Sequence, residues 1–220
     1  MIIEEPLKTK RNSGLFRFIE RTSQAEIYRG NNGQNQELYM TLNKDLHIAI
    51  SGKSGCGNTT VSGLLAEKLG IKLINYTFRQ LAAEKGMTLA EVIEAAKNDD
   101  SYDKYVDSHQ VELAQAEPSV LGSRLAIWVM EKADLKVYLY ASDETRAQRV
   151  FNREGGDLQQ IKDFTAMRDR EDTGRYKAFY GIDNNNYDFV DLIIDTANYN
   201  PEQIVDLILN KLEEKGLITK

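Results

Sequence analysis

A glycine-rich segment contains the residues whose types and spacing most directly suggest chemistry. The segment follows the apolar stretch 46–51 and reads Gly52-Lys53-Ser54-Gly55-Cys56-Gly57-Asn58-Thr59-Thr60. Glycines let a loop turn its backbone N–H groups toward phosphate oxygens, and a helix that begins directly after the loop adds partial positive charge. A hydroxyl at the position of Thr59 can bind Mg²⁺. The segment therefore predicts a phosphate-binding loop, with these nine residues as candidate nucleotide contacts.

The loop lacks one residue that such loops usually carry. Asn58 stands where a lysine normally reaches the β- and γ-phosphates. Lys53 is the only lysine in the loop and is the candidate to supply the missing charge; the alternative is a solvated loop lysine. Cys56 has no neighbouring histidine that would activate a thiolate, so we interpret it as a small loop residue.

Charged residues at helical spacing form a second candidate group. Arg168, Asp172 and Arg175 fall at positions i, i+4 and i+7, which places them on one helix face, where Asp172 can brace both arginines. Guanidinium groups hold phosphates in a bidentate manner and stay charged, which suits phosphoryl transfer. The alternative is a surface ladder of ion pairs, which contributes little to stability.

Two further pairs of polar residues have a helical spacing. Arg149 and Arg153 are candidates for contacts with the phosphates of a donor nucleotide, and a solvated helix face is the competing interpretation. Asp107 and Gln110 lie about one turn apart, so they can share a pocket and read the amide and amine edges of a pyrimidine. Their alternative is an exposed polar face.

The elements that must position these residues follow from the hydrophobic pattern. From residue 46 onward, short apolar runs alternate with segments of helical periodicity, which predicts a parallel sheet covered by helices. A capping box of Thr88 and Glu91 opens an additional helix between the second and third strands, which indicates a small subdomain over the strand ends, where open α/β sheets bind ligands. The predicted strands are 46–51, 71–75, 119–123, 135–141 and 191–195, and the predicted helices are 59–69, 78–85, 102–116, 125–132, 142–152, 158–179 and 201–214.

Residues 1–44 differ in character from the rest. They contain two short strand-like runs around a turn at Asn32-Gly33, which predicts a β-hairpin. We interpret the segment as an N-terminal extension that packs on the main domain; binding of a partner is the alternative.

The composition excludes several classes of protein. One cysteine among 220 residues excludes an internal disulfide framework, and two histidines make a Cys/His zinc site implausible. The sequence has no apolar run of the roughly 18–20 residues that span a bilayer. A net charge of −6 argues against a surface for nucleic acid. We therefore expect a cytoplasmic protein without membrane or nucleic-acid partners.

Four segments resemble cytidylate kinases, in particular the archaeal-type branch of the P-loop nucleoside monophosphate kinases, and the similarity covers roughly residues 46–215. The first, around Arg79, is similar to a helix whose arginine approaches the acceptor phosphate, and the second, with Asp103, Asp107 and Gln110, resembles a helix of the nucleoside-binding subdomain. The third is Ser123-Arg124-Leu125-Ala126-Ile127-Trp128, and the fourth is the lid signature Arg168-Asp169-Arg170-Glu171-Asp172-Thr173-Gly174-Arg175. The family usually has an acidic residue before the third segment, where this chain has Gly122.

The resemblance implies a three-layer α/β P-loop kinase fold with a parallel five-stranded sheet, a subdomain for the nucleoside monophosphate and a lid. It implies a kinase domain at 45–220 that, as a monomer, uses ATP and Mg²⁺ to phosphorylate CMP or dCMP. A kinase for another acceptor such as UMP, or a regulatory nucleotide-binding module that has lost its chemistry, are the alternatives. Residue types, spacing and the resemblance together give three sets of candidates. The candidate catalytic residues are Lys53, Arg124, Arg168, Asp172 and Arg175. The candidate acceptor contacts are Arg79, Asp103, Asp107, Gln110, Arg124 and Arg175, and the candidate donor contacts are residues 52–60, Arg149 and Arg153, with Thr59 as the metal ligand.

Overall fold

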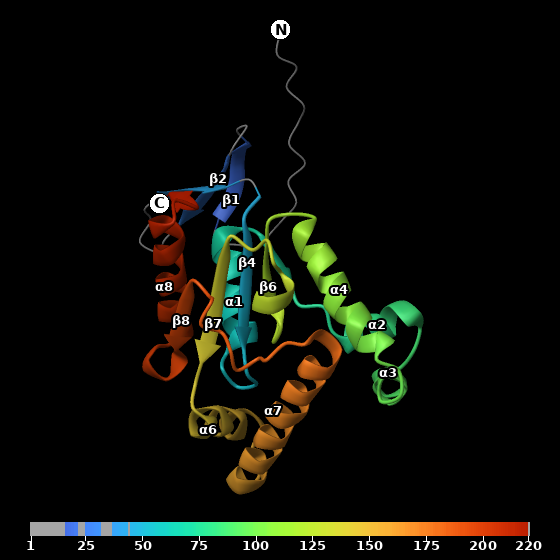
Figure 1. Cartoon of the computed structure of the whole chain (residues 1–220). Helices are drawn as coiled ribbons and strands as arrows, with labels where there is room; N and C mark the ends of the chain where they lie inside the picture. The colour runs from blue at the N-terminus through green and yellow to red at the C-terminus, as the bar shows by residue number, and fades with distance from the viewer. Residues whose placement is uncertain (1–15, 22–24, 32–36, 44, 220) are drawn as a thin grey trace.

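A parallel sheet of five strands forms the centre of the molecule (Figure 1). The computed structural model describes residues 16–21, 25–31, 37–43 and 45–219. The strand order is β5-β6-β4-β7-β8, and every neighbouring pair is parallel. The strands are β4 (His47–Gly52), β5 (Lys72–Ile74), β6 (Ser119–Gly122), β7 (Leu135–Tyr140) and β8 (Leu192–Asp195). The predicted parallel sheet is therefore confirmed.

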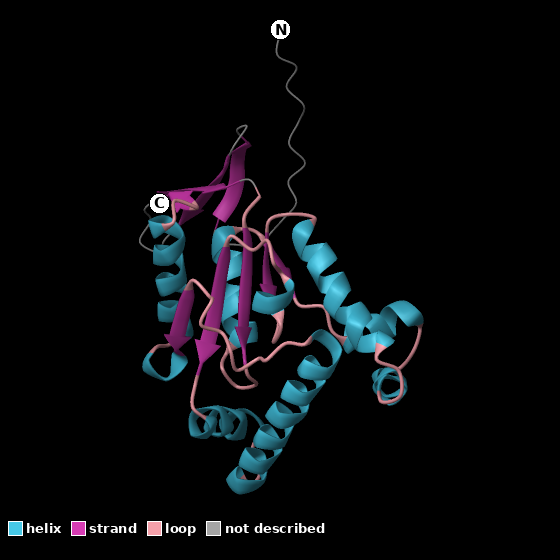
Figure 2. Cartoon of the chain, viewed as in Figure 1, coloured by secondary structure: helices cyan, strands magenta, loops and turns pink. Residues whose placement is uncertain are grey.

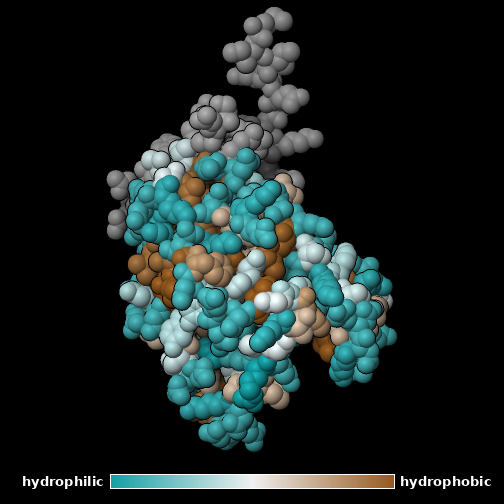
Figure 3. Space-filling view, viewed as in Figure 1, coloured by the Kyte–Doolittle hydropathy of each residue, from teal (hydrophilic) through white to brown (hydrophobic). Residues whose placement is uncertain are grey.

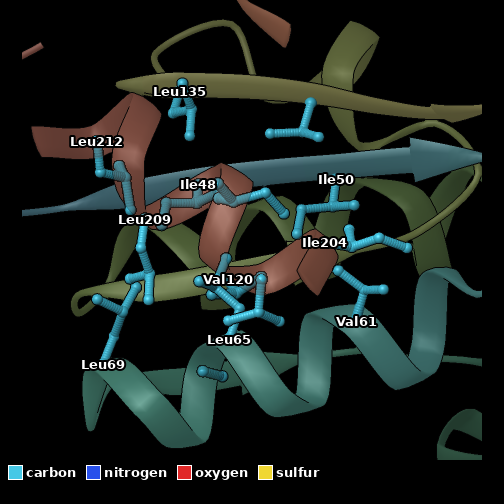
Figure 4. Packing of buried hydrophobic residues seen from close by; sticks show 14 of the residues in the cluster. Ile48, Ile50, Val61, Leu65, Leu69, Val120, Leu135, Ile204, Leu209 and Leu212 are labelled. Atoms are coloured by element: carbon cyan, nitrogen blue, oxygen red, sulfur yellow. The ribbon is translucent and has the colours of Figure 1, made fainter. Parts of the chain in front are cut away.

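Helices cover both faces of this sheet and give the three layers that the sequence predicts (Figure 2). Helices α1 (Asn58–Leu69) and α8 (Pro201–Glu214) pack on one face, where buried aliphatic side chains of both helices meet those of β4 and β6 (Figure 4). Helices α4 (Ser101–Gln115) and α5 (Ala126–Val129) cover the other face around a second apolar cluster. Burial of these two faces is what holds the strand ends in place.

The predicted subdomain is built from α2 (Phe78–Lys85), α3 (Leu89–Ala96) and α4. Both short helices begin with a capping box, formed by Thr77 with Gln80 and by Thr88 with Glu91. In each box the threonine hydroxyl accepts from a backbone N–H of the first turn, and the other side chain accepts from the backbone N–H of the threonine. The three helices share a small apolar core of their own. Its members are Tyr76, Leu81, Ala82, Val92 and Val106.

Helices α6 (Asp143–Glu154) and α7 (Leu158–Tyr180) lie beyond the carboxyl ends of the strands (Figure 1). Helix α7 carries the predicted lid signature, and the turn between α6 and α7 contains Gly155 and Gly156, both with positive φ. In the described ranges, no helix is both long enough and apolar enough to cross a bilayer.

The helix predicted at 125–132 is much shorter than expected, because α5 ends at Val129. Met130 leaves the helical region, with φ −91° and ψ 77°, and its side chain is fully buried in the second apolar cluster. The backbone then turns back toward the sheet, where the Asp134 amide donates to the His47 carbonyl at 2.8 Å. Anchoring of this connection to β4 therefore stops the helix after one turn.

A second, antiparallel sheet contains the N-terminal strands. Its order is β1 (Phe16–Arg21), β2 (Ala25–Asn31), β3 (Glu37–Asn43) and β9 (Ile218–Thr219). The pairing of β2 with β3 fits the predicted hairpin, whose turn at Asn32-Gly33 lies outside the described residues. Strands β1 and β9 were not expected. Leu42 in β3 pairs with Ile218 in β9, and both side chains are buried in the main core.

Leu42 should therefore contribute to the stability of the whole domain. We expect Leu42→Ala to lower the free energy of unfolding by about 2–5 kcal/mol. The leucine is 2% exposed, and its removal leaves a cavity in the main core, the apolar cluster formed with β4, α1 and α8. Urea unfolding followed by circular dichroism measures the effect. The same change at Leu73, which is 39% exposed, is the control and should cost less than about 1 kcal/mol. An equally small effect at Leu42 would show that the N-terminal sheet is only loosely attached.

Candidate active site

A cavity of about 850 Å³ opens at the carboxyl ends of the central strands. It lies between the glycine-rich loop, the subdomain and α7, and Figure 3 shows the notch that separates the subdomain from α7 on the molecular surface. Most of the predicted site residues line it, as do Tyr76, Thr196, Tyr199 and Pro201, which were not expected there. The predicted residues in the lining are 52–60, Asp103, Asp107, Gln110, Arg124, Arg149, Arg153, Arg168 and Arg175.

Two glycines with positive φ and a helix N-terminus shape the glycine-rich loop. Gly55 and Gly57 adopt φ values of 86° and 93°, in the region that favours glycine, and α1 begins directly after Gly57. The loop therefore presents backbone and a helix N-terminus to the cavity, a combination that suits an anion. Cys56 is 2% exposed, and burial raises the pKa of its thiol to about 11. The thiol stays protonated at neutral pH, in agreement with its interpretation as a small loop residue.

Lys53 lines this cavity and also a small neighbouring one that contains Asp169, Asp172 and Asn184. In the part of the chain that the structure describes, its ammonium group forms no ion pair. Lys53 is thus a cation at the edge of the loop that is not already held by a carboxylate, which keeps both of its interpretations open.

Arg146 connects the loop to helices α6 and α7, and sequence reasoning missed this role. Its side chain is 1% exposed and donates to the Ser54 carbonyl at 3.0 Å. It also pairs with Asp143 in α6 and with Asp169 in α7, each at 2.6 Å. Burial disfavours the charge of Arg146, but the two carboxylates outweigh this effect and raise its pKa. The loop backbone is therefore held by a permanently charged, buried guanidinium.

Of the two arginines predicted for the donor phosphates, only Arg149 is fixed against the loop. Its guanidinium donates to the Thr196 hydroxyl at 2.8 Å, to the Thr196 carbonyl at 2.6 Å and to the Gly55 carbonyl at 3.3 Å. Thr196 begins the 3-10 turn Thr196–Asn198 after β8, and no sequence motif marked it. Arg153 reaches the cavity from an exposed position and pairs with Glu154.

The arginines around Asp172 are arranged differently from the sequence prediction. Asp172 is buried and accepts hydrogen bonds from Arg175 at 2.8 Å and from Arg124 at 2.7 Å. The prediction that it also braces Arg168 is wrong, because the turn after β6 brings Arg124 to its second oxygen. Arg168 instead lies over the ring of Phe164, with 5.8 Å between the guanidinium and the ring centroid. Two cations, from the turn and from the lid, thus meet at one carboxylate.

Three polar residues of α4, Asp103, Asp107 and Gln110, line the same cavity as Arg124 and Arg175 and are called the polar wall below. Asp107 accepts hydrogen bonds from the Tyr180 hydroxyl at 2.7 Å and from the Gln110 amide at 3.1 Å. Burial raises the pKa of Asp107 to about 6, although the Tyr180 hydrogen bond acts in the opposite direction. Burial also raises the pKa of Asp103, which Arg175 opposes from 3.5 Å. Tyr180, the last residue of α7, was missed by the sequence analysis.

Some polar atoms of this site are buried without a partner. Among the described residues, Gln110 Oε1 and Arg175 Nε have no hydrogen-bond partner although both side chains reach the cavity. Native proteins leave few such atoms, so each is an argument for a ligand that completes its hydrogen bonds.

The remaining predicted residues concern the acceptor phosphate and the metal. Arg79 is exposed in the first turn of α2 and does not line the cavity, so its contact with the acceptor stays a prediction. Thr59 lines the cavity, and the described residues contain no group of three or more acidic, histidine or cysteine side chains that is placed to hold a metal alone. This donor set fits Mg²⁺ that arrives with nucleotide phosphates, since Mg²⁺ usually takes few ligands from the protein.

Comparisons with known proteins agree with this geometry. The solved structure of an uncharacterized protein from Eubacterium ventriosum matches with a TM-score of 0.56 and 19% identity, covering 76% of this chain and 98% of that one. Shikimate kinase from Bacteroides thetaiotaomicron matches with a TM-score of 0.53 and 17% identity, over 76% and 98% of the two chains. At these identities the likeness establishes the fold, that of the P-loop kinases.

Sequence relatives are more specific. Cytidylate kinase 2 of Borreliella burgdorferi is 44% identical over 176 residues, which cover 78% of this chain and 98% of the relative. Cytidylate kinase of Archaeoglobus fulgidus is 42% identical over 175 residues, 78% of this chain and 97% of the relative. The model of the cytidylate kinase-like family matches residues 47–198, from the start of β4 to the end of the 3-10 turn after β8. The chain therefore belongs to the cytidylate kinase-like family.

Proposed function

We propose that this chain is a cytidylate kinase that transfers the γ-phosphoryl group of ATP to CMP or dCMP. The observation that carries the proposal is a single cavity in which a phosphate loop, a carboxylate-braced pair of arginines and a polar wall for a base face one another. Family membership and relatives named cytidylate kinase support it.

The proposed reaction is an in-line displacement. A phosphate oxygen of the acceptor forms a bond to the γ-phosphorus, the bond to the β,γ-bridging oxygen breaks, and ADP leaves with that electron pair. Positioning and charge neutralisation supply nearly all the catalysis of such a transfer. In this proposal the loop backbone holds the β- and γ-phosphates, while Arg124 and Arg175 neutralise charge between acceptor and donor. Mg²⁺, held by Thr59 and the nucleotide, would neutralise part of the phosphate charge.

The polar wall supports a cytosine base. Gln110 Oε1 is a buried acceptor without a partner among the described residues, and the exocyclic amine of cytosine is a donor. Uracil has a carbonyl at the position of this amine. The carbonyl oxygen and Gln110 Oε1 would then both be acceptors without a donor, at a cost of roughly 1–3 kcal/mol. CMP and dCMP share this base, so both are proposed acceptors.

A regulatory nucleotide-binding module is the second candidate. It is favoured by Asn58 and Gly122, which replace a charged residue in the loop and an acidic residue beside it. Nucleotide binding without any turnover would establish this alternative.

We also propose a division of the chain into a kinase domain at 45–220 and an appended element at 1–44. The family match begins at residue 47, which supports this boundary. Strand β9 lies in the proposed kinase domain but pairs with β3 of the appended element. The two parts therefore share one sheet, although the sequence divides them at residue 45.

Acceptor specificity tests the proposed activity directly. In a coupled assay of ADP formation with ATP and Mg²⁺, we expect kcat/KM for CMP and dCMP to exceed that for AMP by at least about 10²-fold, because the chain belongs to the cytidylate kinase-like family and relatives over 40% identical are named for the cytidylate acceptor. UMP should fall between them. Equal or better turnover of AMP would contradict the proposal, and ADP binding without phosphorylation of any of the four acceptors would favour the regulatory module.

The raised pKa of Asp107 predicts an effect on stability. A carboxyl whose pKa is raised by burial ionises more readily in the unfolded chain, so stability is lost as the pH rises from about 4 through the folded value of about 6. We expect Asp107→Asn to raise the free energy of unfolding at pH 7.5 by about 1–3 kcal/mol, with the gain vanishing near pH 4. Urea unfolding at both pH values measures it.

The control for this experiment is the exposed Asp188, whose change to asparagine should alter stability by less than about 0.5 kcal/mol at either pH. A loss of stability in Asp107→Asn at pH 7.5 would mean that the carboxylate is stabilised by its hydrogen bonds more than it is destabilised by burial. Because Asp107 faces the proposed base, the same variant should have a lower kcat/KM for CMP.

A further inference from the structure

The residue at the lysine position of the phosphate loop is held by a neighbour that the reaction itself does not use. Asn58 is the first residue of α1 and lines the cavity. Its Oδ1 accepts a hydrogen bond from the Ser62 hydroxyl, one turn later in the helix, at 3.0 Å. Oδ1 therefore faces the protein. In the described part of the chain the amide nitrogen of Asn58 has no protein partner, so its two hydrogens remain available for a ligand.

The Ser62 hydroxyl is itself confined by the end of β6. Ser62 is fully buried, and a Cβ atom at Gly122 would lie 2.6 Å from Ser62 Oγ and 2.8 Å from Ser62 Cβ. Rotation of the hydroxyl would not make room, because the Cβ contact is also too short. The same Cβ would lie 3.6 Å from Asn58 Oδ1. The three residues Asn58, Ser62 and Gly122 therefore pack against one another. Because glycine has no Cβ, Gly122 leaves the space that the Ser62 side chain occupies.

We propose that Ser62 is a positioning residue of the phosphate loop, whose hydroxyl locks the Asn58 amide with its two N–H bonds directed at the nucleotide phosphates. An amide offers donors without a charge, and donors that are fixed in advance stabilise phosphate charge better than donors that must first be ordered. The pair would then replace the lysine ammonium by an oriented neutral group. This inference rests on the proposed function in one respect, namely that the cavity binds a nucleotide.

A double-mutant cycle on ADP affinity tests the proposal. We expect Ser62→Ala and Asn58→Ala each to weaken ADP binding by about 3–10-fold, which is the usual value of one such hydrogen bond. The double variant should bind ADP no more weakly than Asn58→Ala alone, because Ser62 acts only through Asn58. Isothermal titration calorimetry gives all four dissociation constants. Ser119→Ala is the matched control, since it removes another fully buried serine hydroxyl, one that donates to the Ala114 carbonyl away from the cavity.

Additive losses in the double variant, or ADP affinity of Ser62→Ala equal to that of the parent, would overturn the proposal. Should Ser62→Ala fail to fold, the unaltered protein still provides a test through the ¹⁵N resonance of the Asn58 side-chain amide, identified by its absence from Asn58→Ala. ADP should shift this resonance, and an unchanged resonance at saturation would overturn the proposal. Because no acceptor enters these measurements, an intact cycle without CMP phosphorylation would contradict only the proposed kinase activity.

Discussion

Replacement of Arg175 by alanine is expected to lower kcat for CMP phosphorylation by roughly 10³-fold or more, as the loss of an arginine at a transferring phosphoryl group does. Arg175 extends from α7 into the cavity and is held by Asp172 at 2.8 Å and Asp103 at 3.5 Å, while its Nε remains without a partner among the described residues. Burial disfavours its charge, yet Asp103 and Asp172 outweigh this and raise the pKa of Arg175. The guanidinium is therefore charged and already oriented before a nucleotide binds.

Steady-state kinetics with saturating ATP and CMP measure this effect. Arg170→Ala is the matched control, because Arg170 is exposed on the same helix and does not line the cavity; its kcat should stay within about twofold of the parent. Arg175→Lys keeps a charge but loses the planar fork, so it should recover only a small part of the activity. If Arg175→Ala kept kcat within a few-fold of the parent, the ion pairs around Asp172 would be a structural ladder only.

Lys53→Ala is expected to lower kcat/KM for ATP by about 10²-fold or more, which corresponds to a charged contact of about 3 kcal/mol in the transition state. Lys53 is the only lysine of the phosphate loop, and it lines the cavity without an ion pair in the described ranges. Asn58 supplies hydrogen bonds but no charge, so Asn58→Ala should cost less than Lys53→Ala. The ranking of the two single variants is the informative result.

Lys132→Ala provides the control, since Lys132 is exposed after α5 and does not line the cavity, and its kcat/KM should equal that of the parent. A Lys53→Ala enzyme close to parent activity would place Lys53 in solvent. The positive charge at the donor phosphates would then come from Arg149, Arg153 and Arg168, all of which line the cavity.

Local pattern was sufficient for most of the fold. The strands of the central sheet lie within one residue of their predicted bounds, because each is a short apolar run that ends at a turn. Helix α8 begins at its proline and ends where its periodicity ends, as predicted. Strand β9 was missed because two residues carry no periodicity. Its existence depends on pairing with β3, from a distant part of the sequence. Helix α5 was predicted too long for a related reason, since its end is set by the contact of Asp134 with β4.

Site residues could be predicted where neighbours in sequence act together. The glycine-rich loop and Arg175 were recognised from local spacing, and the structure brings them to one cavity. Arg146, Thr196 and Tyr180 were missed because their contacts join residues far apart in the chain. Arg146 meets Asp169 across 23 positions and Ser54 across 92, and Tyr180 meets Asp107 across 73. Spacing within one helix likewise suggested Arg168 as the partner of Asp172, whereas the carboxylate is taken by Arg124, 48 positions away.

The pairing of β3 with β9 has a consequence for how the chain folds as it leaves the ribosome. Strands β1, β2 and β3 are synthesised first, but the sheet gains its fourth strand only after residues 218–219 have been made. Leu42 then packs beside Ile218, in the core that α8 also completes. Contacts between residues so distant in sequence form late, because the intervening chain must first be ordered. During translation the four-stranded sheet should therefore be completed only after α8 and β9 have left the ribosome.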